Sequence, residues 1–277
     1  MADISWEPIG RFGAAVDFDL SRKPDERQLE GMRGLLDVHR LLLFEGQQLS
    51  YDDQVSVSSW FGKAHREDTP SILSPDPELG GLGRKELSFH SDMSCCEPLD
   101  AISLFAVDVS EGRTSTRYVD AVGAARRLPT SLRKRVEGLT ALHLWPTLAS
   151  SSERPRGKWD IPEGWPGAEH PALMHHPRSG EDILYLNASQ TERIVELEAE
   201  EGEALILELF EVLYDPAYIY DHVWKNGDLV IWDNLALQHG RHSIPEGVNR
   251  CLQRVSVGND PYGVNMPDEF RTAYGFA

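Results

Sequence analysis

His90 and Asp92 have residue types and a spacing that suit metal chemistry. They stand two positions apart in "LSFHSDMS" (87–94). If this segment is extended, both side chains point to one face, and a rise of ~3.3 Å per residue separates their Cα atoms by about 6.6 Å. An imidazole and a carboxylate at that separation can converge on one small cation. A second histidine would complete the 2-His-1-carboxylate triad that binds Fe(II) and leaves positions open for other ligands.

The third ligand must come from elsewhere among the 10 histidines. His239 follows the predicted strand "LVIWDN", within "LALQHGRHS". A rolled β-sheet can bring the end of one core strand close to a ligand that is distant in sequence. His242 is the nearest rival and His222 is another, and spacing alone does not choose among the three.

The composition indicates a soluble globular chain and excludes some partners. The chain has 277 residues with 40% hydrophobic content and a formal charge of −18, which argues against nucleic acid and anionic membrane surfaces. Its three cysteines are Cys95, Cys96 and Cys251, an arrangement that suits reduced thiols better than disulfides. The first ten residues are polar, and no run of ~18 apolar residues could cross a membrane. We therefore expect a cytoplasmic protein.

Most predicted strands lie after residue 87, whereas the helices lie early or as insertions. A first helix is expected to open after Pro24 and end near His39, Ser50 can cap a second, and 61–86 is expected to be loop. Further helices are predicted at 121–129, at 131–139 with Thr130 or Ser131 as cap, and at 200–215. Strands are predicted in "RLLLFEG" (40–46), "AISLFAVDV" (101–109), "STRYVD" (115–120), "DILYLN" (182–187), "GDLVIWDN" (227–234) and "RCLQRVSVG" (250–258).

This pattern favours a mainly β fold with flanking helices (α+β), either a sandwich or a jelly roll, over a regular βαβ alternation. We expect a single domain over 1–277. Residues 147–168 are rich in Ser, Pro and Gly and are expected to form a lid or an insertion.

Five segments of the chain resemble, in order, the taurine/2,4-dichlorophenoxyacetate dioxygenase (TauD/TfdA) family of Fe(II)/2-oxoglutarate-dependent oxygenases. They are "GAAVDFDLSRKPDERQLEGMRGLLDVHRLLLFEGQQLS", "WFGKA", "FHSD", "STRYVDAVGAARRLP" and "HVWKNGDLVIWDNLALQHGRHS". The resemblance implies a double-stranded β-helix (jelly-roll, cupin-like) core. It also implies a dioxygenase that uses Fe(II), 2-oxoglutarate and O2, hydroxylates an unactivated C–H bond, and releases succinate and CO2.

The resemblance also assigns roles residue by residue. His90, Asp92 and His239 match the iron ligands, which makes them the catalytic centre. Thr116 matches the threonine that contacts 2-oxoglutarate, and Arg250 matches the arginine that pairs with its distal carboxylate. The chain departs from the family in "EGRTST", where Thr114 competes with Thr116, and "TRYVD" favours Thr116.

Substrate contacts follow from the same comparison. Arg254 matches an arginine near the substrate anion; it shares a strand face with Arg250, about 13 Å away. Glu67 and Glu86 fall where the taurine enzyme has a His and an Asn, so a sulfonate is not expected. We expect a small polar or carboxylate-bearing substrate, such as an amino-acid derivative or a natural-product intermediate. Family members often form dimers or tetramers, so a homo-oligomer is expected.

Alternative functions remain open at this stage. Asp92 argues against a halogenase, because related halogenases replace this carboxylate with a small residue. The same iron centre could drive desaturation, epoxidation or cyclisation in a biosynthetic pathway. A non-catalytic metal-binding jelly-roll protein and a zinc hydrolase are the alternatives from other classes, and the pairing of Arg250 with Thr116 favours the oxygenase over the hydrolase.

Overall fold

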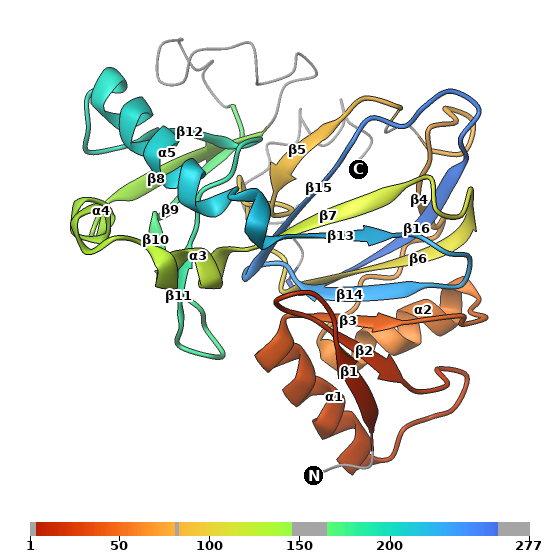
Figure 1. Cartoon of the computed structure of the whole chain (residues 1–277). Coiled ribbons are helices and arrows are strands. Elements are labelled where there is room, and N and C mark those ends of the chain that lie inside the picture. The colour runs from red at the N-terminus through yellow and green to blue at the C-terminus, as the bar shows by residue number, and fades with distance from the viewer. Residues whose placement is uncertain (1–3, 81–82, 146–164, 260–277) are drawn as a thin grey trace.

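Two mainly antiparallel β-sheets form the centre of the molecule in the computed structural model, which describes residues 4–80, 83–145 and 165–259 (Figure 1). The larger sheet has the order β1 (Ser5–Pro8), β2 (Ala14–Asp17), β3 (Leu41–Phe44), β14 (Leu229–Asp233), β6 (Ala101–Val109), β16 (Arg250–Val257), β4 (Ser71–Leu73). The smaller sheet has the order β13 (Ile219–Val223), β7 (Ser115–Asp120), β15 (Leu237–Arg241), β5 (Leu87–His90). Among the described strands, β2 and β3 are the one pair that runs parallel. The expected jelly-roll core is confirmed.

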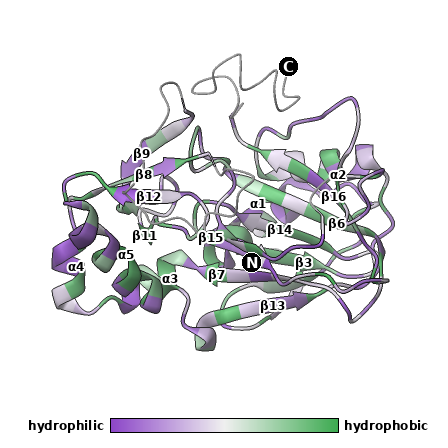
Figure 2. Ribbon diagram, turned by 90° about the horizontal axis from the view of Figure 1, so that it is seen from above, coloured by the Kyte–Doolittle hydropathy of each residue, from purple (hydrophilic) through white to green (hydrophobic). Residues whose placement is uncertain are grey.

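The space between the two sheets is filled by one core cluster. Leu104 and Val230 contribute from the larger sheet, and Tyr118 and Leu237 from the smaller one. β14 is buried at all five positions, as its continuous apolar run "LVIW" predicts for a central strand. Figure 2 shows the contrast between hydrophobic strands in the centre and a largely hydrophilic α4 at the edge.

Two N-terminal helices pack on the larger sheet. α1 (Glu26–His39) begins with a capping box in which Asp25 and Gln28 bond reciprocally, and α2 (Tyr51–Ser58) begins with Ser50 as its cap. A second core cluster includes Met32 and Leu36 of α1. Both helices were predicted, and the second cap is the predicted residue.

The remaining elements form a lobe beside the sheets. Its helices are α3 (Ala121–Arg127), α4 (Thr130–Val136) and α5 (Ala199–Leu213). Its strands are β8 (Thr140–Leu144), β9 (Gly167–Pro171), β10 (Leu173–His175), β11 (Asp182–Leu184) and β12 (Thr191–Ile194). Outside these elements, a short 3-10 turn at Ser59–Phe61 follows α2, and another at Pro216–Tyr218 precedes β13. The predicted lid at 147–168 lies mostly outside the described residues.

Two local predictions are wrong. The segment 61–86 is not loop throughout, because Ser71–Leu73 forms β4 and pairs with Leu252–Arg254 of β16. Neither Thr130 nor Ser131 caps α4, because the N-cap position is Pro129 and no side chain makes the capping bond. A strand as short as β4 carries little periodicity of its own and depends on its partner.

One residue of β6 is left out of its ladder with β16. Cys251 pairs with Asp108 and Leu252 pairs with Ala106, so Val107 forms a β-bulge and is exposed. β16 keeps its period of two across this point. Arg250 and Arg254 therefore share a face with the buried Leu252, as the sequence predicts.

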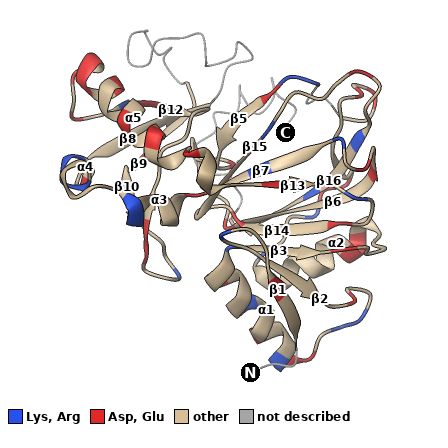
Figure 3. Ribbon diagram, in the orientation of Figure 1, with Lys and Arg blue, Asp and Glu red and all other residues tan. Residues whose placement is uncertain are grey.

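The acidic composition is visible on one helix of the lobe. Acidic side chains are prominent along α5 (Figure 3). Within the described residues, no helix is long and apolar enough to cross a membrane.

His143 of β8 is a fully buried imidazole in the lobe. Its Nδ1 lies 3.3 Å from Thr191 Oγ1, and its ring centroid lies 5.6 Å from that of His170 and 5.5 Å from that of Tyr185. Burial, followed by the charge of His170, lowers the pKa of His143 to about 3. The ring is therefore neutral in the folded protein at pH values where it would be charged in the unfolded chain.

We expect His143 to make the protein less stable in mild acid. The folded-state pKa is depressed, so this stabilisation is complete above pH 6.5 and is lost as pH falls from 6.5 towards 3. Between pH 7.5 and 5.5 the loss is about 1.4 kcal/mol. Urea unfolding of the metal-free protein at both pH values measures the free energy of unfolding. Between pH 7.5 and 5.5 this free energy should fall by about 1.4 kcal/mol less in His143→Gln than in the wild type. His242→Gln, at an exposed site, is the control, and an unchanged pH dependence in His143→Gln would contradict the assignment.

Candidate active site

His90, Asp92 and His239 come together at one end of the smaller sheet. His90 is the last residue of β5 and is the cross-strand partner of His239 in β15. Their ring centroids lie 4.3 Å apart. Asp92 Oδ1 lies 3.3 Å from His90 Nε2 and 3.8 Å from His239 Nε2. One ligand atom from each residue falls within 4.8 Å of the others.

The donor set fits ferrous iron. Two imidazole nitrogens and one carboxylate oxygen form the 2-His-1-carboxylate set that non-haem iron oxygenases use. His90 Nδ1 is bonded to Ser88 O at 2.8 Å, which directs Nε2 towards Asp92. Each of the three side chains is less than one-fifth exposed, so a bound metal would be largely shielded from water.

Asp92 reaches the histidines from a turn, which differs from the extended segment that its spacing suggested. β5 ends at His90, and Asp92 lies in the turn that follows. Asn234 fixes this turn, because its Oδ1 accepts from Asp92 N–H and its Nδ2 donates to Asp92 O, both at 2.9 Å. The same Nδ2 donates to Leu99 O at 3.0 Å. Sequence reasoning used "WDN" only as context for His239 and missed this role of Asn234.

Arg254 holds the other oxygen of the Asp92 carboxylate. Its Nε and Nη2 donate to Asp92 Oδ2 at 3.1 and 2.6 Å. The two oxygens of Asp92 therefore have separate partners, since Oδ1 faces the histidines and Oδ2 faces the guanidinium. The structure thus gives Arg254 a contact with the triad, and its contact with substrate stays a prediction.

The charges of the triad are set by burial and by each other. Burial would raise the pKa of Asp92, but the charge of Arg254 and the hydrogen bond with His90 hold it well below its usual range. Burial, followed by the charge of His90, lowers the pKa of His239 to about 3. Burial opposes protonation of His90, but Asp92 outweighs it and raises the pKa of His90. Asp92 is thus ionised and His239 neutral at neutral pH, the states that metal ligation requires.

Thr116 and Arg250 form a second polar group on the inner face of the sheets. Arg250 Nη2 donates to Thr116 Oγ1 at 3.0 Å, and Trp224 Nε1 donates to the same oxygen at 2.9 Å. Among the described residues, Arg250 Nε has no hydrogen-bond partner. Burial, followed by the charge of Arg241, lowers the pKa of Arg250 to about 9. A buried guanidinium with an unbonded N–H suits a carboxylate ligand, which would pair with its charge.

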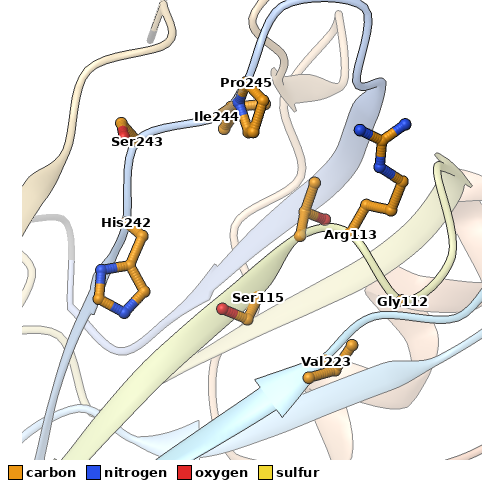
Figure 4. A pocket seen from close by; sticks show the side chains of 9 residues that line it. Gly112, Arg113, Ser115, Val223, His242, Ser243, Ile244 and Pro245 are labelled. Carbon is orange, nitrogen blue, oxygen red and sulfur yellow. The ribbon is translucent and has the colours of Figure 1, made fainter.

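The rival residues lie elsewhere. Thr114 and His242 line a cavity of about 230 Å³ between the start of β7, the end of β13 and the segment after β15 (Figure 4). His242 is exposed. His222 is buried and its Nε2 lies 3.2 Å from Asp228 Oδ2. The geometry thus favours His239 and Thr116 over these three alternatives.

Glu67 and Glu86 are not gathered with the triad in the described contacts. Both are exposed, and Glu67 contributes its backbone N–H to a bond with the Tyr51 hydroxyl. Their predicted contact with substrate stays a prediction.

We expect Arg254→Gln to weaken metal binding. The change removes a charged donor pair from Asp92 Oδ2, and loss of such an outer partner of a ligand costs ~10- to 100-fold in metal affinity. Anaerobic titration of Fe(II) against a chelator measures the effect. Arg66→Gln breaks an exposed ion pair with Asp52 and should leave the affinity unchanged. Equal metal affinity in the Arg254 variant and the wild type would refute this role.

The fold and the donor set together define a class, the non-haem iron oxygenases built on a double-stranded β-helix. The model of the family described as "Taurine catabolism dioxygenase TauD, TfdA family" matches residues 5–256. The chain therefore belongs to the TauD/TfdA family. It is a 2-oxoglutarate-dependent dioxygenase that uses Fe(II), 2-oxoglutarate and O2.

Individual relatives cover nearly the whole chain. It is 29% identical over 294 residues to pentalenolactone F synthase of Streptomyces avermitilis, which covers 94% of this chain and 95% of that protein. It is 28% identical over 278 residues to an alpha-ketoglutarate-dependent 2,4-dichlorophenoxyacetate dioxygenase of Cupriavidus pinatubonensis, with 90% and 95% covered. A solved taurine dioxygenase from Burkholderia xenovorans superposes with a TM-score of 0.76 at 25% identity, covering 93% and 90% of the two chains.

Proposed function

We propose that this dioxygenase hydroxylates an unactivated C–H bond of a small polar or carboxylate-bearing molecule. One atom of O2 enters the hydroxyl group and the other enters succinate, which leaves with CO2 when 2-oxoglutarate is decarboxylated. The main observation that supports this proposal is that the 2-His-1-carboxylate cluster and the Arg250–Thr116 pair both lie between the same two sheets. The first suits a metal, and the second suits the distal carboxylate of the co-substrate.

Two groups of residues would bind the metal and the co-substrate. His90, Asp92 and His239 would hold Fe(II), which supplies the activation of oxygen when it is bound. Arg250 would pair with the distal carboxylate of 2-oxoglutarate while Thr116 donates its hydroxyl hydrogen to it. Trp232, whose ring centroid lies 4.9 Å from that of His239, would form an apolar wall that excludes water from a bound metal.

The substrate class rests on charge. Arg254 is less than one-fifth exposed and points to the ligand end of the site through its bond with Asp92. Arg254 also matches the arginine that lies near the substrate anion in the taurine enzyme, and a guanidinium has enough donors to bond a substrate carboxylate in addition to Asp92. Screening small acids and amino-acid derivatives for substrate-stimulated succinate release tests the class. Stimulation by neutral molecules but by no acid would reject it.

A visible charge-transfer band on adding Fe(II) and 2-oxoglutarate without oxygen is the direct test of the reaction type. We expect a band that requires both components. Absence of the band, together with zinc-dependent hydrolysis, would overturn the proposal.

Desaturation, epoxidation or cyclisation at the same iron centre is the second candidate outcome. A curated relative is named pentalenolactone F synthase, which makes oxidative steps other than simple hydroxylation worth testing. Once a substrate is found, mass spectrometry separates oxygen insertion (hydroxylation or epoxidation, plus one oxygen) from dehydrogenation (desaturation or cyclisation, minus two hydrogens), and NMR of the product separates the members of each pair.

We also propose that the protein forms a homodimer or homotetramer. Light scattering would measure its mass in solution and test this proposal.

A further inference from the structure

Arg241 is a buried cation that the roles assigned so far do not use. It is the last residue of β15, two positions after His239, and only 3% exposed. A period of two in a strand places its side chain on the same inner face as His239.

The register of β15 brings Arg241 beside the predicted co-substrate residues. β15 pairs with β7 so that His239 opposes Tyr118 and Gly240 opposes Arg117. Continuing this register by one residue places Arg241 opposite Thr116. Thr116 is also the residue that Arg250 contacts from the larger sheet, so Arg241 lies on the strand beside a residue that Arg250 bonds.

The two arginines repel each other. The charge of Arg241 is, after burial, the second cause of the lowered pKa of Arg250. The charges of both guanidinium groups would attract an anion that binds at Arg250. A dianionic co-substrate would supply that anion at Arg250.

We propose that Arg241 is a specificity-determining residue that, together with Arg250, selects a co-substrate carrying a second carboxylate. This inference rests on the proposed binding of 2-oxoglutarate at Arg250 and Thr116. The competing interpretation is that Arg241 only fastens the backbone, since Nη2 donates to Gly83 O at 2.9 Å and Nη1 to His242 O at 3.4 Å. The two interpretations differ in what happens to a 2-oxo acid that lacks the distal carboxylate.

The experiment compares 2-oxoglutarate with 2-oxopentanoate, which has the same chain length and no distal carboxylate. Anaerobic titration with Fe(II), followed by the visible band, gives the ratio of the two dissociation constants for each variant. We expect Arg241→Gln, which keeps amide donors but removes the charge, to lower the preference for 2-oxoglutarate ~10-fold. Arg241→Lys, which keeps the charge, should restore most of the preference.

The matched control is Arg117→Gln. Arg117 is the neighbour of Thr116 on the opposite face of β7, over the ring of Phe89, and its loss should leave the ratio unchanged. If Arg241→Gln weakens both ligands equally, or neither, the residue only supports the backbone and the inference is wrong. If the wild type gives no band with 2-oxoglutarate, the proposed function itself fails, which is a separate result.

Discussion

Asp92→Ala is expected to abolish succinate formation coupled to substrate oxidation while the fold remains intact. The variant removes the only carboxylate of the triad, leaves two imidazoles, and deprives Arg254 of the carboxylate that it bonds. Loss of an outer partner of a metal ligand costs ~10- to 100-fold, so loss of the ligand should exceed ~100-fold in activity. Succinate release and the iron content of the purified protein measure the two consequences.

The fold should tolerate this change because backbone contacts hold the turn. Asn234 bonds the backbone N–H and carbonyl of residue 92, and neither bond needs the carboxylate. A circular dichroism melt would check that the variant is folded. Asp221→Ala, the same substitution at an exposed site of β13, should retain full activity. Full activity in Asp92→Ala would reject the metal assignment.

Arg250→Met is expected to raise the 2-oxoglutarate concentration needed for turnover by ~10- to 100-fold. Hydrogen bonds to a charged group contribute about 1.5 to 3 kcal/mol, and every 1.4 kcal/mol is about tenfold in affinity. Titration of the visible band gives the dissociation constant, and succinate release at saturating 2-oxoglutarate gives the remaining rate. We expect the rate to recover substantially at high co-substrate.

The same variant should not destabilise the protein in the absence of 2-oxoglutarate. Among the residues that the structure describes, no carboxylate pairs with Arg250, so its buried guanidinium carries a desolvation cost that Met at the same place avoids. Without 2-oxoglutarate, we expect the melting temperature of Arg250→Met to equal or exceed that of the wild type. Adding 2-oxoglutarate should raise the melting temperature of the wild type and not that of the variant. A variant with wild-type co-substrate affinity would contradict the role of Arg250.

The strands of the central sheets could be predicted because their patterns are strong. β6 and β7 match their predicted bounds, and β14 and β16 lie within the predicted segments. The weaker strands were missed for a physical reason. β4 and β13 are short or carry polar residues, and each exists through pairing with β16 or β7, which lie far away in sequence.

The sequence predicts which residues form the candidate site, but it does not predict the contacts between them. Spacing and family resemblance brought forward His90, Asp92 and His239, and the structure gathers them. The bond between Arg254 and Asp92 depends on how two sheets face each other, and a single strand carries no information about that. Asn234 was missed because its function is to hold a backbone turn, which leaves no spacing signal in the sequence.

The bulge at Val107 has an electrostatic consequence. In an uninterrupted ladder, Asp108 would take the inward position opposite Arg250, where Val109 now lies. Its carboxylate would then neutralise the guanidinium from within the chain. Instead, Asp108 is exposed and accepts a bond from the Asn249 side chain. Because the bulge skips one residue near the end of β6, the carboxylate of Asp108 stays out of the space beside Arg250 that an acid ligand would occupy.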